Sequence, residues 1–284
     1  MSMRLFEDPK AFQAACIEAR QSGDLGFVPT MGYLHEGHET LMRLAAQHKT
    51  SALSIFVNPT QFGPNEDLAR YPRDLEGDLK KAEACGIALV LAPKDPAAIY
   101  PAGFQTFVEP GAIASTLEGA HRPGHFRGVA TVVLKLLQLS QATDAYFGRK
   151  DYQQLALVQR LALDFDLPTR IVGVPTVREA DGLAKSSRNV YLSPEERQRA
   201  LCLWRAQSAA QAALKAGESR AAALEAIARA EVEKGADRID YVAVRDSLDL
   251  SEIDHVIPGR AVILFAAFVG RTRLIDNGLL GQDQ

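Results

Sequence analysis

The order of segments along the chain predicts an α/β fold, in which a parallel-sheet domain precedes a smaller α+β domain. Strand-like and helix-like segments alternate through residues 1–177. The strand-like segments are almost continuously apolar, which is typical of parallel strands covered by helices on both faces. Beyond residue 189 the order changes to helices followed by three strands, which indicates a second unit of different architecture.

The elements of the first domain follow from capping residues, periodicity and stop signals. Asp8 followed by Pro9 favours a helix start, and that helix should end near Gly23. Gly86 marks the end of another helix. The apolar periodicity then predicts strands over 25–30, 51–57, 87–92, 145–148 and 170–174, and helices over 36–48, 75–85, 129–139 and 152–165.

The second domain is expected to span residues 178–284, with the polar segment 178–189 as a hinge. Ser193 to Glu196 has the form of a capping box with proline at the first helical position. An alanine-rich helix should run from there to about Lys215, where Gly217 stops it. We expect a further helix over 220–234 and strands over 239–245, 261–269 and 273–275.

Composition excludes several classes of protein. The 284 residues include 32 basic and 35 acidic side chains, a net charge of −3, without a long block of like charge, so nucleic acid is not an expected partner. The N-terminus lacks a signal-peptide core, and the longest apolar run, 261–269, is too short to cross a bilayer. Three cysteines without paired spacing favour a cytoplasmic protein without disulfides.

The first chemical cluster, Thr30 to His38, follows a predicted strand and opens a helix. Gly32 and Gly37 allow close approach of the backbone to a ligand. A helix start near Glu36 offers free N–H groups to phosphate, and two histidines three residues apart would share one face. Imidazolium donors there would stabilise charge on a reacting phosphate. Half of a metal site is the alternative interpretation, although no third metal ligand stands nearby.

Three more polar clusters follow strands or lie in the hinge. Amides in the segment 58–61 can bind a hydroxy acid, although an ordinary Asn-Pro turn is the simpler interpretation. The segment 148–154 offers a lysine for phosphate and an aspartate for ribose, and the segment 185–188 offers two hydroxyls and two cations. Because ligands of parallel sheets bind beyond the carboxyl ends of the strands, we expect the clusters to form one anion- and hydroxyl-binding site.

The residues that carry these clusters resemble the pantothenate synthetase (pantoate–β-alanine ligase) family, within the nucleotidyltransferases that have a His-X-Gly-His motif. The resemblance extends over nearly the whole chain and includes motifs outside the four clusters. The matching stretches are 28–38, 54–62, 70–73, 117–119, 122–129, 147–155, 171–175, 181–189 and 273–277.

The resemblance implies a Rossmann-like first domain and a two-step reaction. ATP and pantoate would form pantoyl adenylate and pyrophosphate, and β-alanine would then attack the mixed anhydride to give pantothenate and AMP. Magnesium would accompany ATP, since it offsets the charge of the triphosphate. The resemblance also implies a homodimer.

The resemblance assigns roles to individual residues. The catalytic residues would be His35, His38, Lys150 and Arg188. Gln61 and Gln154 would bind pantoate, with Asn58 beside them, and Asp78 is a candidate for a water-bridged magnesium contact. The metal ligands themselves are not identified. ATP would contact Met31, Gly32, Tyr33, Leu34, His35, Glu36, Gly37, His38, Gly148, Arg149, Lys150, Asp151, Val177, Lys185, Ser186, Ser187 and Arg188.

Two positions depart from the family pattern, and rival functions stay open. Lys185 stands where methionine or leucine is common, and Arg149 where an acidic residue is common. Another nucleotidyltransferase, an aminoacyl-tRNA synthetase and a nucleotide-binding module without catalysis are the alternatives. The glutamine pair disfavours the first, and the acidic balance disfavours the second.

Overall fold

The computed structural model describes residues 3–64, 66 and 68–282, which form two compact units. The first comprises residues up to Ser115, Arg122–Gly148 and Leu157–Pro175. The second comprises Thr116–His121, Arg149–Ala156 and the chain from Thr176 onward. Two short segments from the first part of the sequence therefore pack with the second unit. The boundary predicted at residue 177 stays a prediction.

The first unit is built on a six-stranded sheet in which every neighbouring pair is parallel, as predicted. Its strand order is β1-β4-β3-β2-β5-β6. From β2 the chain proceeds outward through β3 and β4, and then resumes with β5 and β6 on the other side. The strands are β1 (Arg4–Phe6), β2 (Leu25–Thr30), β3 (Thr50–Ile55), β4 (Leu89–Leu91), β5 (Asp144–Gly148) and β6 (Arg170–Val174).

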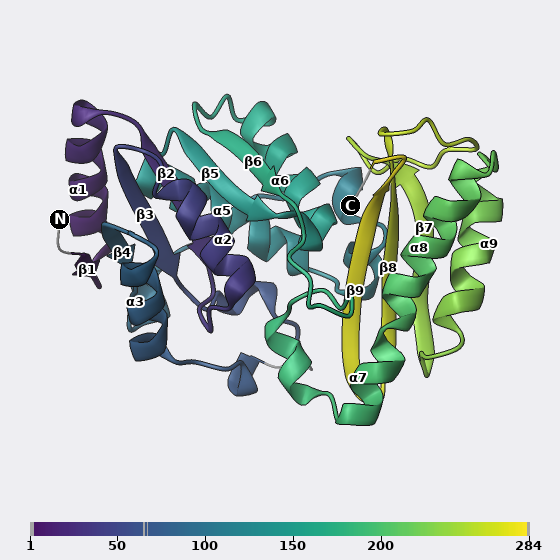
Figure 1. Ribbon diagram of the computed structural model, residues 1–284. Coiled ribbons are helices and arrows are strands. Elements are labelled where there is room, and N and C mark those ends of the chain that lie inside the picture. Colours follow the sequence, from purple (N-terminus) through teal and green to yellow (C-terminus); the bar gives the residue numbers. More distant parts are fainter. Residues whose placement is uncertain (1–2, 65, 67, 283–284) are drawn as a thin grey trace. The chain divides into compact units, whose positions relative to one another are not determined.

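Helices cover both faces of this sheet, and α2 crosses the face turned to the viewer in Figure 1. Val28, Met42, Leu53 and Val90 form part of the core between the sheet and this helix layer. The Asp8 carboxylate caps the first helix through the amides of Lys10 and Ala11. The helices are α1 (Pro9–Ser22), α2 (Glu36–Ala45), α3 (Leu75–Ala84), α5 (His125–Ser140) and α6 (Tyr152–Asp164), the last of which begins in the second unit.

The second unit contains an antiparallel sheet of order β7-β8-β9, packed on helices α8 and α9. Phe265 and Ile263 of the central strand are fully buried in its core, together with Leu224. The helices and strands are α4 (Glu118–His121), α7 (Pro194–Ala200), α8 (Cys202–Lys215), α9 (Ala221–Val232), β7 (Arg238–Asp246), β8 (Ala261–Val269) and β9 (Thr272–Leu280). Short 3-10 turns are η1 (Pro59–Gln61), η2 (Leu68–Arg70), η3 (Pro96–Ala98), η4 (Ala112–Ala114), η5 (Arg149–Asp151) and η6 (Ser187–Tyr191).

Several sequence-based boundaries were wrong. The alanine-rich helix expected to reach Lys215 is divided at Leu201 into α7 and α8. At this break Gly235 packs so closely that a Cβ there would lie 2.3 Å from the carbonyl oxygen of Arg199. Strand β9 extends to Leu280 rather than ending at Ile275. Strand β1 and helix α4 were not expected at all, since three or four residues are too short for a periodic pattern.

No helix among the described residues combines the length and apolar character needed to cross a membrane.

Candidate functional site

The loop between β2 and α2 turns sharply because two consecutive residues adopt left-handed backbone conformations, Gly32 at φ 84° and Tyr33 at φ 53°. Glycine is required at the first position, since a Cβ there would lie 2.9 Å from a carboxylate oxygen of Asp78. That carboxylate, on α3, accepts the backbone N–H groups of Tyr33 and Leu34, each at 2.7 Å. Asp78 therefore fixes the shape of the loop.

Burial raises the pKa of Asp78 above its usual value, although the two backbone hydrogen bonds and the charge of Lys81 act in the opposite direction. Lys81 also donates to the carbonyl oxygen of Leu34 at 2.6 Å. Each oxygen of the Asp78 carboxylate accepts a backbone N–H of the loop. This arrangement supports a structural role for Asp78 in the loop, and the water-bridged magnesium contact implied by the resemblance stays a prediction.

Two histidines form a reciprocal cap at the start of α2. His35 is the N-cap, and its Nδ1 accepts the N–H of Gly37 at 3.2 Å, while Nδ1 of His38 accepts the N–H of His35 at 3.3 Å. A Cβ on Gly37 would lie 2.9 Å from the His35 ring, so glycine is needed for this packing. The two rings lie 4.1 Å apart between centroids.

This cap indicates the tautomer of both rings. An Nδ1 that accepts a hydrogen bond has no proton, so the ring proton of the neutral imidazole resides on Nε2. Each histidine can then donate through Nε2 at a helix N-terminus, where the backbone dipole also favours negative charge. The geometry thus favours neutral donors over the imidazolium ions expected from the sequence.

Asn58 and Gln61 lie after the neighbouring strand β3, and Gln61 contacts the first loop. Gln61 donates through Nε2 to the sulfur of Met31 at 3.1 Å, and its Oε1 accepts the amide of Asn58 at 3.0 Å. Asn58 is 1% exposed, and its Nδ2 also donates to the carbonyl of Gly128 at 3.2 Å. Its Oδ1 accepts the Tyr100 hydroxyl at 2.8 Å. The amide of Asn58 is thus engaged by protein groups and orients Gln61.

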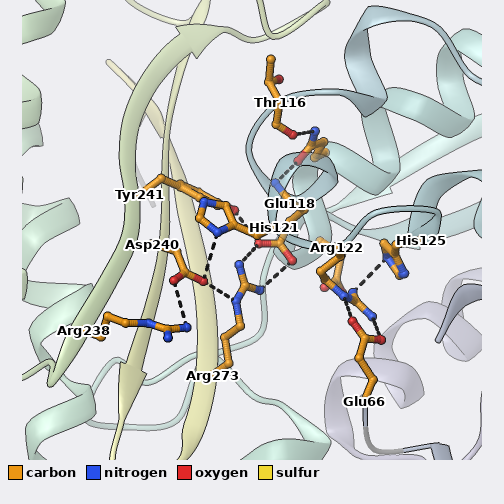
Figure 2. A network of polar contacts seen from close by, with 12 residues as sticks. Glu66, Thr116, Glu118, His121, Arg122, His125, Arg238, Asp240, Tyr241 and Arg273 are labelled. Carbon is orange, nitrogen blue, oxygen red and sulfur yellow. Dashed lines mark hydrogen bonds and ion pairs between the residues drawn. The ribbon is translucent and has the colours of Figure 1, made fainter. Parts of the chain in front are cut away.

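A chain of side chains, of which Figure 2 shows Glu66, Arg122 and His125, also holds the backbone of Gln61. Nδ1 of His125 donates to the carbonyl of Gln61 at 2.8 Å, and Arg122 donates to Nε2 of His125 at 3.0 Å. Arg122 also makes two hydrogen bonds to Glu66, at 2.7 and 2.8 Å. Burial raises the pKa of Glu66, but the hydrogen bond and charge of Arg122, together with weaker effects of Gly63 and His125, outweigh it, so that the pKa lies below its usual 4.5.

The remaining candidates divide between the two units. Gly148 ends β5 in the first unit, whereas residues 149–156 belong to the second. Lys150 lies 3.5 Å from the carboxylate of Asp151. Gln154 is partly exposed on α6, beside Gln153, which is buried and holds Thr116 and Glu118 through its amide at 2.9 Å each. Gln154, rather than Gln153, is therefore the accessible amide of this pair.

A small hairpin in the second unit brings Val177 to Lys185, whose N–H donates to the carbonyl of Val177 at 2.9 Å. Arg178 and Ala184 form an antiparallel bridge within it. Ser186 then caps the turn η6 by accepting the N–H of Arg188 at 3.2 Å. The hairpin thus joins the predicted base contact to the predicted phosphate contacts.

The first three clusters follow β2, β3 and β5, which are neighbours in the sheet, so the structure brings their starting points to one edge. The strand order reverses between β2 and β5, which is where parallel sheets bind ligands. Local sequence patterns do not indicate the supporting residues, although Glu118, Asp276 and Asn277 stand within stretches that carry the resemblance. Their partners are distant in sequence, so local patterns gave no signal of their contacts.

Comparison with known proteins places these features in a family. The family model for pantoate-beta-alanine ligase matches residues 4–279. Curated pantothenate synthetases include that of Anaeromyxobacter dehalogenans, 52% identical over 97% of this chain and 98% of its own length, and that of Myxococcus xanthus, 54% identical over 93% and 91%.

Two solved structures are similar over nearly the whole chain. The pantothenate synthetase of Thermus thermophilus is 44% identical, with a TM-score of 0.92 over 98% of this chain and 99% of its own. The pantoate-beta-alanine ligase of Francisella tularensis, complexed with beta-gamma ATP and beta-alanine, is 34% identical, with a TM-score of 0.79 over 98% of each chain. With its fold, its motifs and these relatives in agreement, the chain belongs to the pantoate–β-alanine ligase family.

Proposed function

We propose that the family's reaction, ATP-dependent condensation of pantoate with β-alanine through pantoyl adenylate, is carried out here by the segments described above. The observation that supports this best is the pair of capped histidines, which present neutral donors at a helix N-terminus. The ATP phosphates are bound there, with Lys150, Ser186, Ser187 and Arg188 as further ligands. The order of the polar clusters along β2, β3 and β5 supports the same assignment.

In the first step a carboxylate oxygen of pantoate attacks the α-phosphorus. The bond from that phosphorus to the oxygen that bridges it to the β-phosphorus breaks, and pyrophosphate leaves. His35 and His38 stabilise the charge that accumulates on the phosphate oxygens, since the chemistry needs charge compensation and alignment rather than a covalent intermediate on the protein. Both histidines keep their protons.

Pantoate is aligned by Gln61 and Gln154 in this proposal. Gln61 is held by Asn58 through its side chain and by His125 through its carbonyl, so it starts the reaction in a fixed orientation. Asn58 supports Gln61 rather than binding pantoate itself. Asp151 binds ribose hydroxyls, and the backbone of residues 31–37 and Val177 binds the remainder of the nucleotide.

In the second step the amine of β-alanine attacks the acyl carbon of the mixed anhydride. The carbon–oxygen bond to AMP breaks, AMP leaves, and the amine loses a proton to form the amide of pantothenate. Exclusion of water from the anhydride protects the intermediate.

Magnesium enters this proposal with ATP. Among the described residues, no group of three or more histidine, cysteine, aspartate or glutamate side chains is arranged to hold a metal ion. This fits an ion bound mainly by substrate phosphates and water, as magnesium often is. When bound it neutralises part of the triphosphate charge. We also propose a cytoplasmic homodimer, on the basis of the family resemblance.

Product analysis tests the proposal. With ATP, magnesium and pantoate alone, the protein should release pyrophosphate but complete at most about one turnover, because the adenylate stays bound. Addition of β-alanine should give continuous AMP and pantothenate. Gln61→Ala should raise the KM for pantoate more than that for ATP. Turnover without pantoate, or equal changes in both KM values, would contradict it.

A further inference from the structure

Strand β9 carries the motif Arg273–Asn277, to which the proposed reaction assigns no role. Side chains of successive strand residues point to opposite faces of a sheet. Asp276 contacts Arg178, which also reaches Gln207 of helix α8, whereas Arg273 contacts the segment Thr116–His121. Residues of this short motif therefore reach different parts of the same unit.

Asn277 holds the turn that carries Lys150. Its Nδ2 donates to two consecutive carbonyl oxygens, that of Arg149 at 2.9 Å and that of Lys150 at 2.7 Å. The side chain is buried, with 6% of its surface exposed. A primary amide, with its two N–H donors in one plane, can satisfy two carbonyls in this way. The backbone of Lys150 is thereby fixed relative to β9.

Asp276 holds the hairpin that leads to Lys185. It accepts two hydrogen bonds from Arg178, at 2.7 and 2.9 Å, and is 4% exposed. Arg178 lies over the ring of Trp204 at 4.4 Å and donates to the carbonyl of Gly182 at 3.1 Å. Gly182 has φ 96°, and a Cβ there would lie 2.3 Å from the same ring. The hairpin is thus packed in one conformation.

Arg273, which lies on the same face of β9 as Asn277 and opposite Asp276, provides a second anchor, shown in Figure 2. Arg273 makes hydrogen bonds of 2.8 and 2.6 Å to Glu118 and one of 2.7 Å to Asp240. Glu118 also accepts the hydroxyl of Tyr241 at 2.9 Å, and its N–H donates to Gln153, which precedes Gln154 on α6. Strand β9 therefore holds the segment 149–156 at two places. Asn277 binds the start of the segment directly, and Arg273 holds Gln153 through Glu118.

We propose that Asp276 and Asn277 are positioning residues for adenylation, which fix the Lys150 turn and the Lys185–Arg188 segment relative to each other through one strand. The inference rests on the proposed phosphate-binding roles of these two segments. A displacement of about 1 Å at a reacting centre costs about a hundredfold in rate, so a rigid common support matters more for the rate than for binding.

The test compares Asn277→Asp with a matched control, Gln211→Ala. Aspartate keeps the size of the side chain, but it places a carboxylate oxygen, which can only accept hydrogen bonds, against the two carbonyl oxygens. Gln211 is also a buried amide bound to backbone near the end of β9, since it donates to the carbonyl of Gln282 and accepts the N–H of Gly281. Urea unfolding of both variants measures their stability, and pantoate-dependent pyrophosphate release measures adenylation.

Asn277→Asp should lower the rate constant for adenylation by about 10- to 100-fold, with kcat/KM for β-alanine changed less than twofold. Gln211→Ala should lose stability with kcat within twofold of the unchanged protein. Asn277→Ser, which keeps one donor, should recover part of the rate, and it replaces Asn277→Asp if that variant does not fold. Equal rate losses in the Asn277 and Gln211 variants would overturn the proposal.

Lys150→Ala separates this inference from the proposed function. If Lys150→Ala lowers kcat strongly and the Asn277 variants do not, the positioning role is wrong and the phosphate role stands. If Lys150→Ala leaves kcat unchanged, the proposed phosphate role of Lys150 is wrong, and the positioning role that depends on it is overturned as well.

Discussion

Replacement of Asp78 by asparagine tests how the loop Thr30–His38 is held. The buried carboxylate accepts two backbone N–H groups, those of Tyr33 and Leu34, both at 2.7 Å. Asparagine has the same shape, but its single oxygen accepts one of these groups, and its NH2 then faces the other. One hydrogen bond then has a neutral acceptor in place of a charged one, and one buried N–H loses its partner.

The magnitude follows from these two losses. An unpaired buried donor costs about 1–3 kcal/mol. Part of this is offset, because burial raises the pKa of Asp78 and asparagine has no charge to desolvate. We therefore expect the free energy of unfolding to fall by about 1–2 kcal/mol. Because Gly32 and Tyr33 lie in left-handed conformations that the carboxylate stabilises, we also expect adenylation to slow by about 10- to 100-fold.

Urea unfolding and pantoate-dependent pyrophosphate release measure these two effects. Asp74→Asn is the matched control, because it removes the same charge from the start of the same helix, where Asp74 caps the N–H of Gly77 at 3.0 Å. Asparagine caps helices as well as aspartate does, so this variant should be close to neutral. Unchanged stability and rate in Asp78→Asn would refute the assigned role.

Two further predictions concern buried titratable groups. A hydrogen bond from Arg170 lowers the pKa of Asp144 below its usual 3.8, against the effect of burial and with help from His48. A carboxylate whose pKa is lowered by folding adds stability that is complete above its pKa in the unfolded chain and is lost as the pH falls through its pKa in the folded protein. Asp144→Asn should therefore destabilise the protein at pH 7, by an amount that shrinks below about pH 4 when the free energy of unfolding is measured with urea. A constant difference in stability across this pH range would contradict the prediction. Burial raises the pKa of the Cys16 thiol to about 12 and that of the Cys202 thiol to about 11. Iodoacetamide at pH 8 should therefore label these thiols only after the protein unfolds. Rapid labelling of the native protein would contradict this prediction.

Local sequence signals predicted most elements of the fold. Asp8 before Pro9 marks a helix start that depends on nothing distant, and the structure places the cap there. The apolar run 261–269 is a strand with the expected bounds. In contrast, the run Asp276-Asn277-Gly278 has the composition of a turn but continues β9, because Arg178 binds the side chain of Asp276 and the carbonyls of residues 149 and 150 bind that of Asn277.

The same difference between local signals and distant contacts applies to the residues of the site. The glycines and histidines of Thr30–His38 indicate a phosphate-binding helix start from sequence alone, since each residue acts through its own neighbours. The sequence did not reveal that His35 and His38 cap each other, which determines their tautomer. It also did not reveal the support from Asp78 or Asn277, whose partners lie 44 or more residues away. Such contacts depend on tertiary packing.

Pantoate-dependent exchange of labelled pyrophosphate into ATP, without β-alanine, tests most directly the claim that His38 stabilises charge as a neutral Nε2 donor. His38→Ala should slow the exchange by about 100- to 1000-fold, and ATP binding, measured separately, should weaken much less. His38→Gln keeps an N–H donor near the position of Nε2 and should exchange at least about tenfold faster than His38→Ala. If glutamine and alanine variants are equally slow, or if binding falls in parallel with exchange, the account of this histidine is wrong.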